Sequence, residues 1–311
     1  MPCTVYFAAR PDSWASYEAP LRRALEAAGV EAVLSAEAPD PAIVDYLVCA
    51  PDGPVQDFSP FTRAKAVLNL WAGVENIAPN QTLTQPLARM VDPGLQAGMV
   101  EWVTGHVLRH HLGMDADIGN TSGDWAPRVP PLAHERRVAI LGLGELGAAC
   151  GAALNGLGFD VLGWSRTPKT LPGIACHSGE DGLKAVLKRA EILVLLLPLT
   201  AQTENLIDAA ALETLPRGAV IINPGRGPLI DDDALLAALD SGQVSHATLD
   251  VFRVEPLPKD HAFWAHPGVT ITPHIAAATR AETAAPVIAE NIRRGEAGEP
   301  FLHLVDRSAG Y

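Results

Sequence analysis

The chain has 311 residues, of which 48% are hydrophobic and 19% are charged. This length suits one large domain or two smaller ones, and the composition excludes a disordered chain because the apolar residues suffice for a sizeable core. The formal net charge of −13 argues against a nucleic-acid or anionic-membrane partner, since both bind basic surfaces.

Cysteine spacing and the N-terminus indicate the compartment. The four cysteines include no C-x-x-C pair, which is typical of free thiols in a reducing compartment and not of a disulfide framework or a zinc site: Cys3, Cys49, Cys150 and Cys176. The N-terminus lacks the basic and apolar regions of a signal peptide, and the longest apolar run, 192–199, is too short to span a bilayer. We therefore expect a cytoplasmic protein without a membrane segment.

The first third of the chain alternates strand-like and helix-like patterns. Helical spacing predicts helices over 13–28 and 95–111, and short apolar or β-branched runs predict strands at 4–9, 45–50, 65–70 and 89–91. A Gly- and Pro-rich segment over 118–135 then predicts a linker or a surface arm. This alternation is typical of a parallel α/β domain.

A second α/β series follows the arm. Runs such as ILVLLLP and AVIIN are apolar throughout, as expected for parallel strands that are covered on both faces. The series predicts six strands, at 138–141, 160–164, 192–197, 219–222, 247–251 and 269–271, and an amphipathic helix over 280–294 follows it. The sequence therefore predicts an α/β protein with parallel sheets.

A glycine-rich loop opens this second series. The segment RVAILGLGELG places Gly142, Gly144 and Gly147, with Glu145 and Leu146 between the last two, directly between a predicted strand and a small-residue helix. The first glycine suits a tight turn, the second lets backbone approach a pyrophosphate, and the third lets helix and strand pack closely. This strand–loop–helix context favours a dinucleotide-binding loop over a glycine turn without a ligand.

The next predicted strand bears on the choice of cofactor. An NAD site usually has Asp or Glu about 20 residues after the loop, where it accepts from the ribose 2′-hydroxyl. Here the strand ends at Ser165, Arg166 and Thr167, with Lys169 close behind and no carboxylate among them. A guanidinium can pair with a 2′-phosphate, and hydroxyls can donate to it. We therefore expect NADP(H) to be preferred, with NAD(H) as the second choice.

Three further strands end in polar residues. Arg226 follows the strand in IINPGRG, Glu255 follows the strand in LDVFRVEP, and His274 follows the strand in ITPH. Because ligands bind at the carboxyl ends of parallel strands, we expect these three side chains to face one crevice. Taken singly, each would be an ordinary surface or structural residue.

Together, these side chains suit the reduction of a 2-oxo acid. A guanidinium binds the substrate carboxylate and polarises the carbonyl, and a protonated imidazole gives a proton to the developing alkoxide. A carboxylate keeps the imidazole cationic and oriented. The sequence therefore predicts Arg226, Glu255 and His274 as the catalytic set.

Several segments carry a resemblance to a known family. NPGRGPLIDDDALLAAL, LDVFRVEPLP and HPGVTITPHIAAATR resemble the signature segments of the D-isomer-specific 2-hydroxyacid dehydrogenases, and GWSRTPK and the ending VDRSAGY resemble their glyoxylate/hydroxypyruvate reductase A branch. The resemblance extends over nearly the whole chain. It implies two Rossmann-like domains, with a cofactor domain over 99–278 inserted into a substrate domain formed by 1–98 and 279–311.

The resemblance also implies further site residues. Trp71, Ala72, Gly73 and Val74 match a loop whose backbone N–H groups meet the substrate carboxylate. Asp250 and the backbone at Pro224 match positions near the nicotinamide carboxamide, and Leu197 and Pro198 match the adenosine side. Residues 99–101 match the start of the long helix that dimerises in the family, which implies a homodimer, and Trp125 falls where some relatives reach the neighbouring subunit's site.

Two other motifs receive structural interpretations. His106 and His110 have the spacing of a metal pair but no third ligand, so we expect helix-surface histidines and no metal. Asp231, Asp232 and Asp233 open a predicted helix, where acidic residues cap free N–H groups.

The function has two open alternatives. Within the same class, the substrate could be a different 2-oxo or 2-hydroxy acid, such as phosphoglycerate, although the first domain has few extra cations for a phosphate. From another class, a non-catalytic dinucleotide sensor or corepressor could use the same fold. Such a sensor would not need Arg226, Glu255 and His274 together, which favours the enzyme.

Overall fold

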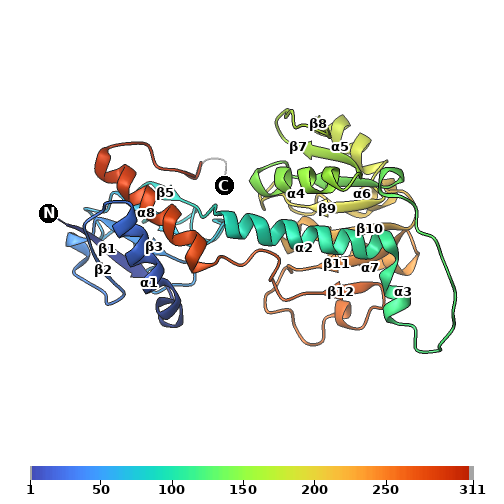
Figure 1. Ribbon diagram of the computed structural model, residues 1–311, viewed down its shortest axis with the longest axis horizontal. Coiled ribbons are helices and arrows are strands. Elements are labelled where there is room, and N and C mark those ends of the chain that lie inside the picture. Colours follow the sequence, from blue (N-terminus) through green and yellow to red (C-terminus); the bar gives the residue numbers. More distant parts are fainter. Residues whose placement is uncertain (1, 308–311) are drawn as a thin grey trace. The chain divides into compact units, whose positions relative to one another are not determined.

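The chain forms two compact units, which Figure 1 shows with their elements labelled. The structure, a computed structural model, describes residues 2–307, so the last four residues of the VDRSAGY segment lie outside the described residues. One unit comprises Met1–Leu95 and Thr279–Tyr311, and the other comprises Gln96–Ala278. The second unit is thus inserted in sequence between two parts of the first.

The first unit contains a five-stranded parallel sheet in the order β2-β1-β3-β4-β5. Helices α1 and α8 pack side by side in this unit (Figure 1). The elements are β1 (Cys3–Ala8), α1 (Pro11–Ala27), β2 (Ala32–Ser35), η1 (Pro41–Ile43), β3 (Tyr46–Cys49), β4 (Ala66–Asn69), β5 (Leu87–Ala88) and α8 (Ala281–Ala297).

Alternate side chains of this sheet enter two cores. On β1, Val5 and Phe7 pack with residues of α1 and α8, whereas Tyr6 and Ala8 pack with the loops that precede and follow β4. This period of two is the consequence of a pleated strand buried on both faces. The apolar run of the first strand is therefore satisfied on both sides.

The second unit contains a seven-stranded parallel sheet in the order β12-β11-β10-β9-β6-β7-β8. Helix α2 (Pro93–Leu112) begins at the end of the first unit and continues into the second. The remaining elements are α3 (Met114–Ile118), η2 (Ala133–Glu135), β6 (Arg137–Leu141), α4 (Glu145–Gly156), β7 (Asp160–Ser165), β8 (Ile174–Ser178), α5 (Gly179–Leu187), β9 (Ile192–Leu195), α6 (Ala209–Thr214), β10 (Ala219–Asn223), η3 (Gly227–Leu229), α7 (Asp232–Asp240), β11 (Val244–Leu249), η4 (Ala262–Trp264) and β12 (Val269–Ile271).

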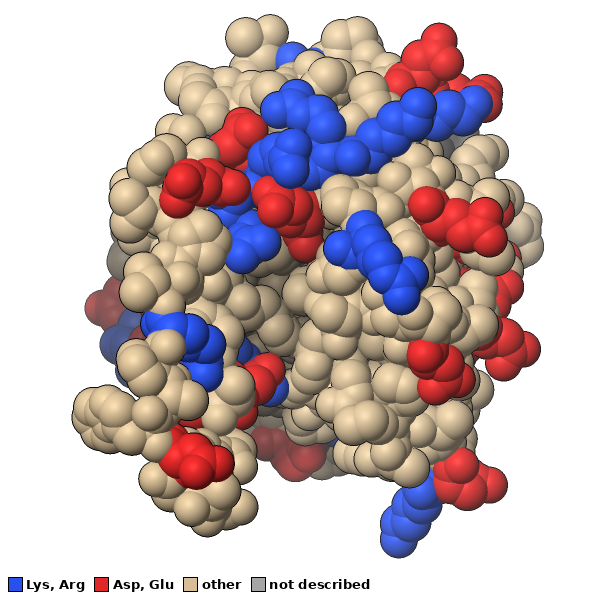
Figure 2. Space-filling model, turned by 90° about the vertical axis from the view of Figure 1, so that its right-hand side faces the viewer, with Lys and Arg blue, Asp and Glu red and all other residues tan. Residues whose placement is uncertain are grey.

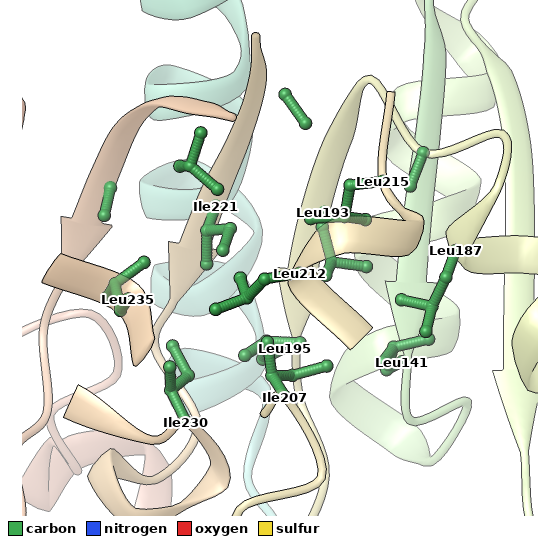
Figure 3. Close-up of a cluster of buried hydrophobic side chains, with 14 of the residues drawn as sticks. Leu141, Leu187, Leu193, Leu195, Ile207, Leu212, Leu215, Ile221, Ile230 and Leu235 are labelled. Carbon is green, nitrogen blue, oxygen red and sulfur yellow. The ribbon is translucent and has the colours of Figure 1, made fainter. Parts of the chain in front are cut away.

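Helices cover both faces of this sheet. Val138 and Ile140 of β6 pack toward α2 and α4, whereas Ala139 and Leu141 pack toward α5, α6 and α7. Figure 3 shows the cluster on the face covered by α5, α6 and α7, in which Leu193 and Leu195 of β9 lie close to Leu212 of α6. Each fully buried aliphatic side chain of this kind contributes roughly 1.5–3 kcal/mol to stability. The predicted fold class, α/β with parallel sheets, is confirmed.

The strand order places a switch point between β6 and β9. The chain runs from β6 outward to β7 and β8, and then returns to β9 on the other side of β6. Open α/β sheets bind ligands at the carboxyl ends of the strands where the order reverses. Gly142, at the carboxyl end of β6, and Leu197, just after β9, lie at this point.

Three edge strands differ from the prediction. β2 and β8 were not predicted, and the strand expected at 89–91 is instead the two-residue strand β5 at Leu87–Ala88. Strands β2 and β8 are only partly buried, with exposed or intermediate residues at most positions. Edge strands of this kind lack the continuous apolar run that marks a central strand.

The histidines of α2 also differ from the prediction. His110 does not lie on the helix surface: its Nε2 is 2.8 Å from Thr248 Oγ1 on β11, and its ring packs on His246. Burial lowers the pKa of His110 to about 3. This histidine is a neutral contact between α2 and the sheet. The aspartate capping prediction is confirmed, because the carboxylate of Asp231 accepts from Ala234 N at the start of α7.

Charged side chains of both signs share the protein surface. On the face drawn in Figure 2, a band of Lys and Arg side chains crosses the upper part, and Asp and Glu side chains lie beside it. Ion pairs in the second unit include Arg189–Asp160 and Lys184–Glu180. Among the described residues, no helix is long and apolar enough to cross a membrane.

Candidate active site

Three neighbouring strands present the predicted catalytic residues. β10, β11 and β12 are adjacent and parallel, and Arg226, Glu255 and His274 each follow one of them. Because parallel strands end at the same edge of a sheet, the three loops emerge on one side of the second unit. The fold thus provides the convergence that the sequence predicts.

Glu255 and His274 form a direct pair. His274 Nδ1 is 2.7 Å from Glu255 Oε2, while Glu255 Oε1 accepts a hydrogen bond from Phe252 N at 2.9 Å. The His274 side chain is 54% exposed within this structure. With Nδ1 occupied by the carboxylate, Nε2 is the nitrogen left to face a substrate.

The pair shifts both pKa values in opposite directions. The hydrogen bond to Glu255 raises the pKa of His274, although burial opposes this shift. Burial alone would raise the pKa of Glu255, but hydrogen bonds from His274 and Phe252 N outweigh it and lower that pKa. The imidazolium form of His274 is therefore stabilised, as a general acid requires.

Arg226 lies close enough to affect both partners. Its charge lowers the pKa of Glu255 and also opposes the rise in the pKa of His274. The buried side chain of Asn223 holds its loop, because Asn223 Nδ2 donates to Arg226 O and Asn223 Oδ1 accepts from Gly225 N. Asn223 was not predicted as a site residue; its signal in the sequence is a polar residue that ends the apolar strand AVIIN.

A buried carboxylate fixes the turn that carries His274. Asp250 is 0% exposed and accepts hydrogen bonds from Thr272 Oγ1, Ile275 N and Ala276 N. His274 has a φ of 53°, a left-handed conformation that non-glycine residues rarely adopt. The three hydrogen bonds to Asp250 stabilise this turn and so direct the imidazole.

The glycine loop has the geometry that a dinucleotide needs. Gly142 has a φ of 105°, and a Cβ at Gly147 would lie 1.8 Å from Gly142 O. A Cβ at Gly144, by contrast, would meet nothing within 4 Å. Gly144 precedes the first turn of α4, whose N–H groups receive no side-chain cap from it. The residues therefore fit a pyrophosphate at this helix N-terminus.

The end of β7 presents several polar groups. Arg166, Thr167 and Lys169 are exposed, whereas Ser165 is buried and its Oγ donates to Thr167 O at 2.8 Å. The hydroxyl of Ser165 thus shapes the turn. The exposed cations remain in a position to meet a phosphate beyond the strand end.

The other predicted cofactor residues follow β9 and β10. Leu197 is buried and Pro198 O accepts from Thr203 Oγ1 at 2.7 Å, while Pro224 is buried beside Gly225. The predicted substrate loop, residues 71–74, belongs to the first unit, where it follows β4. No cluster of three or more His, Cys, Asp or Glu that could hold a metal ion occurs among the described residues.

Comparison with known proteins places this arrangement in a family. The NAD binding domain of the D-isomer specific 2-hydroxyacid dehydrogenases matches residues 105–276. A glyoxylate/hydroxypyruvate reductase A from Yersinia enterocolitica is 40% identical over 255 residues, which cover 79% of this chain and 82% of that protein.

Two solved structures extend the likeness to the whole chain. A D-isomer specific 2-hydroxyacid dehydrogenase from Xanthobacter autotrophicus, in complex with NADPH and MES, has a TM-score of 0.93 and 41% identity and covers 100% of both chains. An NADPH-dependent glyoxylate/hydroxypyruvate reductase from Sinorhizobium meliloti, in complex with NADP and sulfate, has a TM-score of 0.87 and 33% identity and covers 99% of this chain and 100% of that one.

The fold and the site thus define a dinucleotide-dependent dehydrogenase. The chain belongs to the D-isomer-specific 2-hydroxyacid dehydrogenase family, in its glyoxylate/hydroxypyruvate reductase A branch, as the sequence predicts.

Proposed function

We propose that the protein reduces a small 2-oxo acid, such as glyoxylate or hydroxypyruvate, to the 2-hydroxy acid with NADPH. The observation that carries this proposal is the hydrogen-bonded pair of His274 and Glu255, 2.7 Å apart, at the strand edge that also presents Arg226. Relatives named glyoxylate/hydroxypyruvate reductase A support the substrate class.

Each of the three residues has a distinct part in this reaction. Arg226 binds the substrate carboxylate and polarises the C2 carbonyl with its planar guanidinium. NADPH, when bound, supplies a hydride to C2. His274 donates the Nε2 proton to the developing alkoxide, and Glu255 stabilises the imidazolium and fixes its orientation.

The residues that would hold the cofactor lie at the carboxyl ends of strands of the second unit. The loop 142–147 would hold the pyrophosphate, and Arg166, Thr167 and Lys169 would hold the 2′-phosphate, with Ser165 shaping their turn. Leu197 and Pro198 would contact the adenosine side, and the Pro224 backbone would contact the carboxamide. Asp250 acts through its turn, because its carboxylate already accepts three hydrogen bonds. Two relatives solved with NADPH or NADP support the preference for NADP(H).

The two units have different roles in this proposal. We propose that the first unit supplies the substrate loop, residues 71–74, and that the second binds the cofactor. A homodimer is supported by the arm after α3, where the apolar side chains of Trp125 and Val129 are each 96% exposed. Four free cysteines support a reducing, cytoplasmic location. The molar mass in solution tests the dimer, and a mass of one chain would contradict it.

Loss of NADPH absorbance with a panel of 2-oxo acids tests the function. We expect turnover of glyoxylate and hydroxypyruvate, and a lower KM for NADPH than for NADH because two cations and no carboxylate follow β7. No turnover of any 2-oxo acid while NADPH still binds would favour a sensor. A lower KM for NADH would contradict the cofactor preference.

The pH profile gives a second prediction. Because Glu255 raises the pKa of His274, kcat should stay high at low pH and fall as the pH rises through the raised pKa. Glu255→Gln removes the charged partner, so this fall should begin at lower pH, and the maximal kcat should drop about tenfold or more. The measurement is kcat against pH for both proteins; an unchanged profile would show that Glu255 does not set the pKa of the acid.

A further inference from the structure

The buried side-chain amide of Asn69 donates hydrogen bonds to the predicted substrate loop of the first unit, residues 71–74. Asn69 ends β4 and is 1% exposed. Its Nδ2 donates to Trp71 O at 2.8 Å and to Gly73 O at 3.1 Å. One side chain thus captures two carbonyl groups of a four-residue loop.

Other carbonyl groups in and next to this loop also accept hydrogen bonds within the first unit. Trp71 O accepts a second hydrogen bond from Met90 N, and Val74 O accepts from Ile77 N and Ala78 N. Leu70 O, just before the loop, accepts from Thr279 Oγ1 at 3.0 Å. By contrast, the backbone N–H groups of residues 71–74 donate to no acceptor among the described residues.

Because peptide groups are planar, these contacts determine the direction in which the N–H groups of the loop point. In a trans peptide the N–H points opposite to the carbonyl of the same plane. Since Trp71 O and Gly73 O both point toward Asn69, the N–H groups of Ala72 and Val74 point away from it. Two amides that face the same way form a site for an anion such as a carboxylate.

The side chain of Asn69 is itself only partly satisfied by hydrogen bonds. Its Oδ1 is buried and has no hydrogen-bond partner among the described residues. An unsatisfied buried acceptor is unfavourable, and rotating the amide would place Oδ1 against two carbonyl oxygens.

We propose that Asn69 is a positioning residue for substrate binding: its amide fixes the loop 71–74 so that the Ala72 and Val74 N–H groups present an anion site for the carboxylate of the 2-oxo acid. This role rests on the proposed function, because that function supplies the carboxylate. Asn69 acts through the backbone and does not itself touch the substrate.

Steady-state kinetics of Asn69→Leu and Asn69→Ser test this role. Loss of two neutral hydrogen bonds corresponds to a rise of about 10- to 30-fold in KM for the 2-oxo acid. We expect kcat at saturation to change by less than about threefold and KM for NADPH to stay the same, because the loss affects substrate binding equally in the ground and transition states.

Asn291 provides a matched control in the same unit. It is 3% exposed and its Oδ1 accepts from Leu302 N, with no contact to the loop. Asn291→Ser should lower Tm as Asn69→Ser does while leaving KM for the acid unchanged. Oxalate, as a dicarboxylate probe, should bind the NADP complex of Asn69→Ser more weakly than the wild-type complex in calorimetry, which needs no turnover.

The outcomes separate the two hypotheses. A wild-type protein that turns over no 2-oxo acid contradicts the proposed function. An active wild type, with folded Asn69 variants whose KM and oxalate affinity are unchanged, overturns the role of Asn69 alone. An equal rise in KM in Asn291→Ser would likewise overturn it, because the effect would then reflect lost stability.

Discussion

Replacing His274 with alanine is expected to lower kcat by about 10²- to 10⁴-fold, the usual contribution of a general acid. KM for the 2-oxo acid and for NADPH should change little, because the proton moves only in the transition state. The reason is geometric: Nδ1 of His274 is occupied by Glu255, which leaves Nε2 as the donor to the alkoxide. Steady-state kinetics with a saturating 2-oxo acid measures this loss.

A second substitution at His274 controls for a change in the backbone of its turn. His274 has a left-handed backbone, which alanine adopts reluctantly but asparagine tolerates better. His274→Asn should therefore keep the turn and still lose the activity. His134, an exposed histidine of η2, gives a matched imidazole deletion outside the site. A kcat near that of the wild type in His274→Asn would show that the proton comes from another group.

Replacing Arg226 with alanine should damage both kinetic constants. We expect kcat to fall by about 10²- to 10³-fold, as when one donor to a developing oxyanion is removed, and KM for the 2-oxo acid to rise. Arg226→Lys should recover only part of the activity, because an ammonium keeps the charge but not the planar fork. The two constants are measured separately with each 2-oxo acid of the panel.

The pH profile distinguishes the loss of Arg226 from a general loss of structure. Because the charge of Arg226 opposes the rise in the pKa of His274, Arg226→Ala should move the fall in kcat to higher pH. Glu255→Gln should move it in the opposite direction. Arg217→Ala is the control, since Arg217 is exposed and donates to Ser241 O at the other end of β10. A normal KM and kcat in Arg226→Ala would remove this residue from the site.

Central strands were easier to predict than edge strands. The apolar runs ILVL and AVIIN became β9 and β10, because each is buried on both faces of the sheet. Strands β2 and β8 lie at sheet edges, where partial exposure permits polar residues and hides the pattern. Strand β5 has only two residues, too few for any periodicity.

The order of residues along the chain was enough to show which polar residues follow which strand. Arg226, Glu255 and His274 each stand after an apolar run, and parallel strands end at one edge, so their convergence could be predicted. The glycine loop was local in part: a Cβ at Gly147 would meet Gly142 O within the same turn, whereas a Cβ at Gly142 would meet Leu196 O beyond the neighbouring strand β9.

The hydrogen bonds that hold these loops became clear from the folded chain alone. Asp250 accepts hydrogen bonds from a turn more than 20 residues away, and Asn223 closes the loop of Arg226 while its carbonyl accepts from Asp250 N. His110 became a partly buried contact because Thr248 of β11 lies opposite it. Such hydrogen bonds depend on which strands are neighbours and in what register. Sequence periodicity reports burial, but it does not report the partner of a buried polar group.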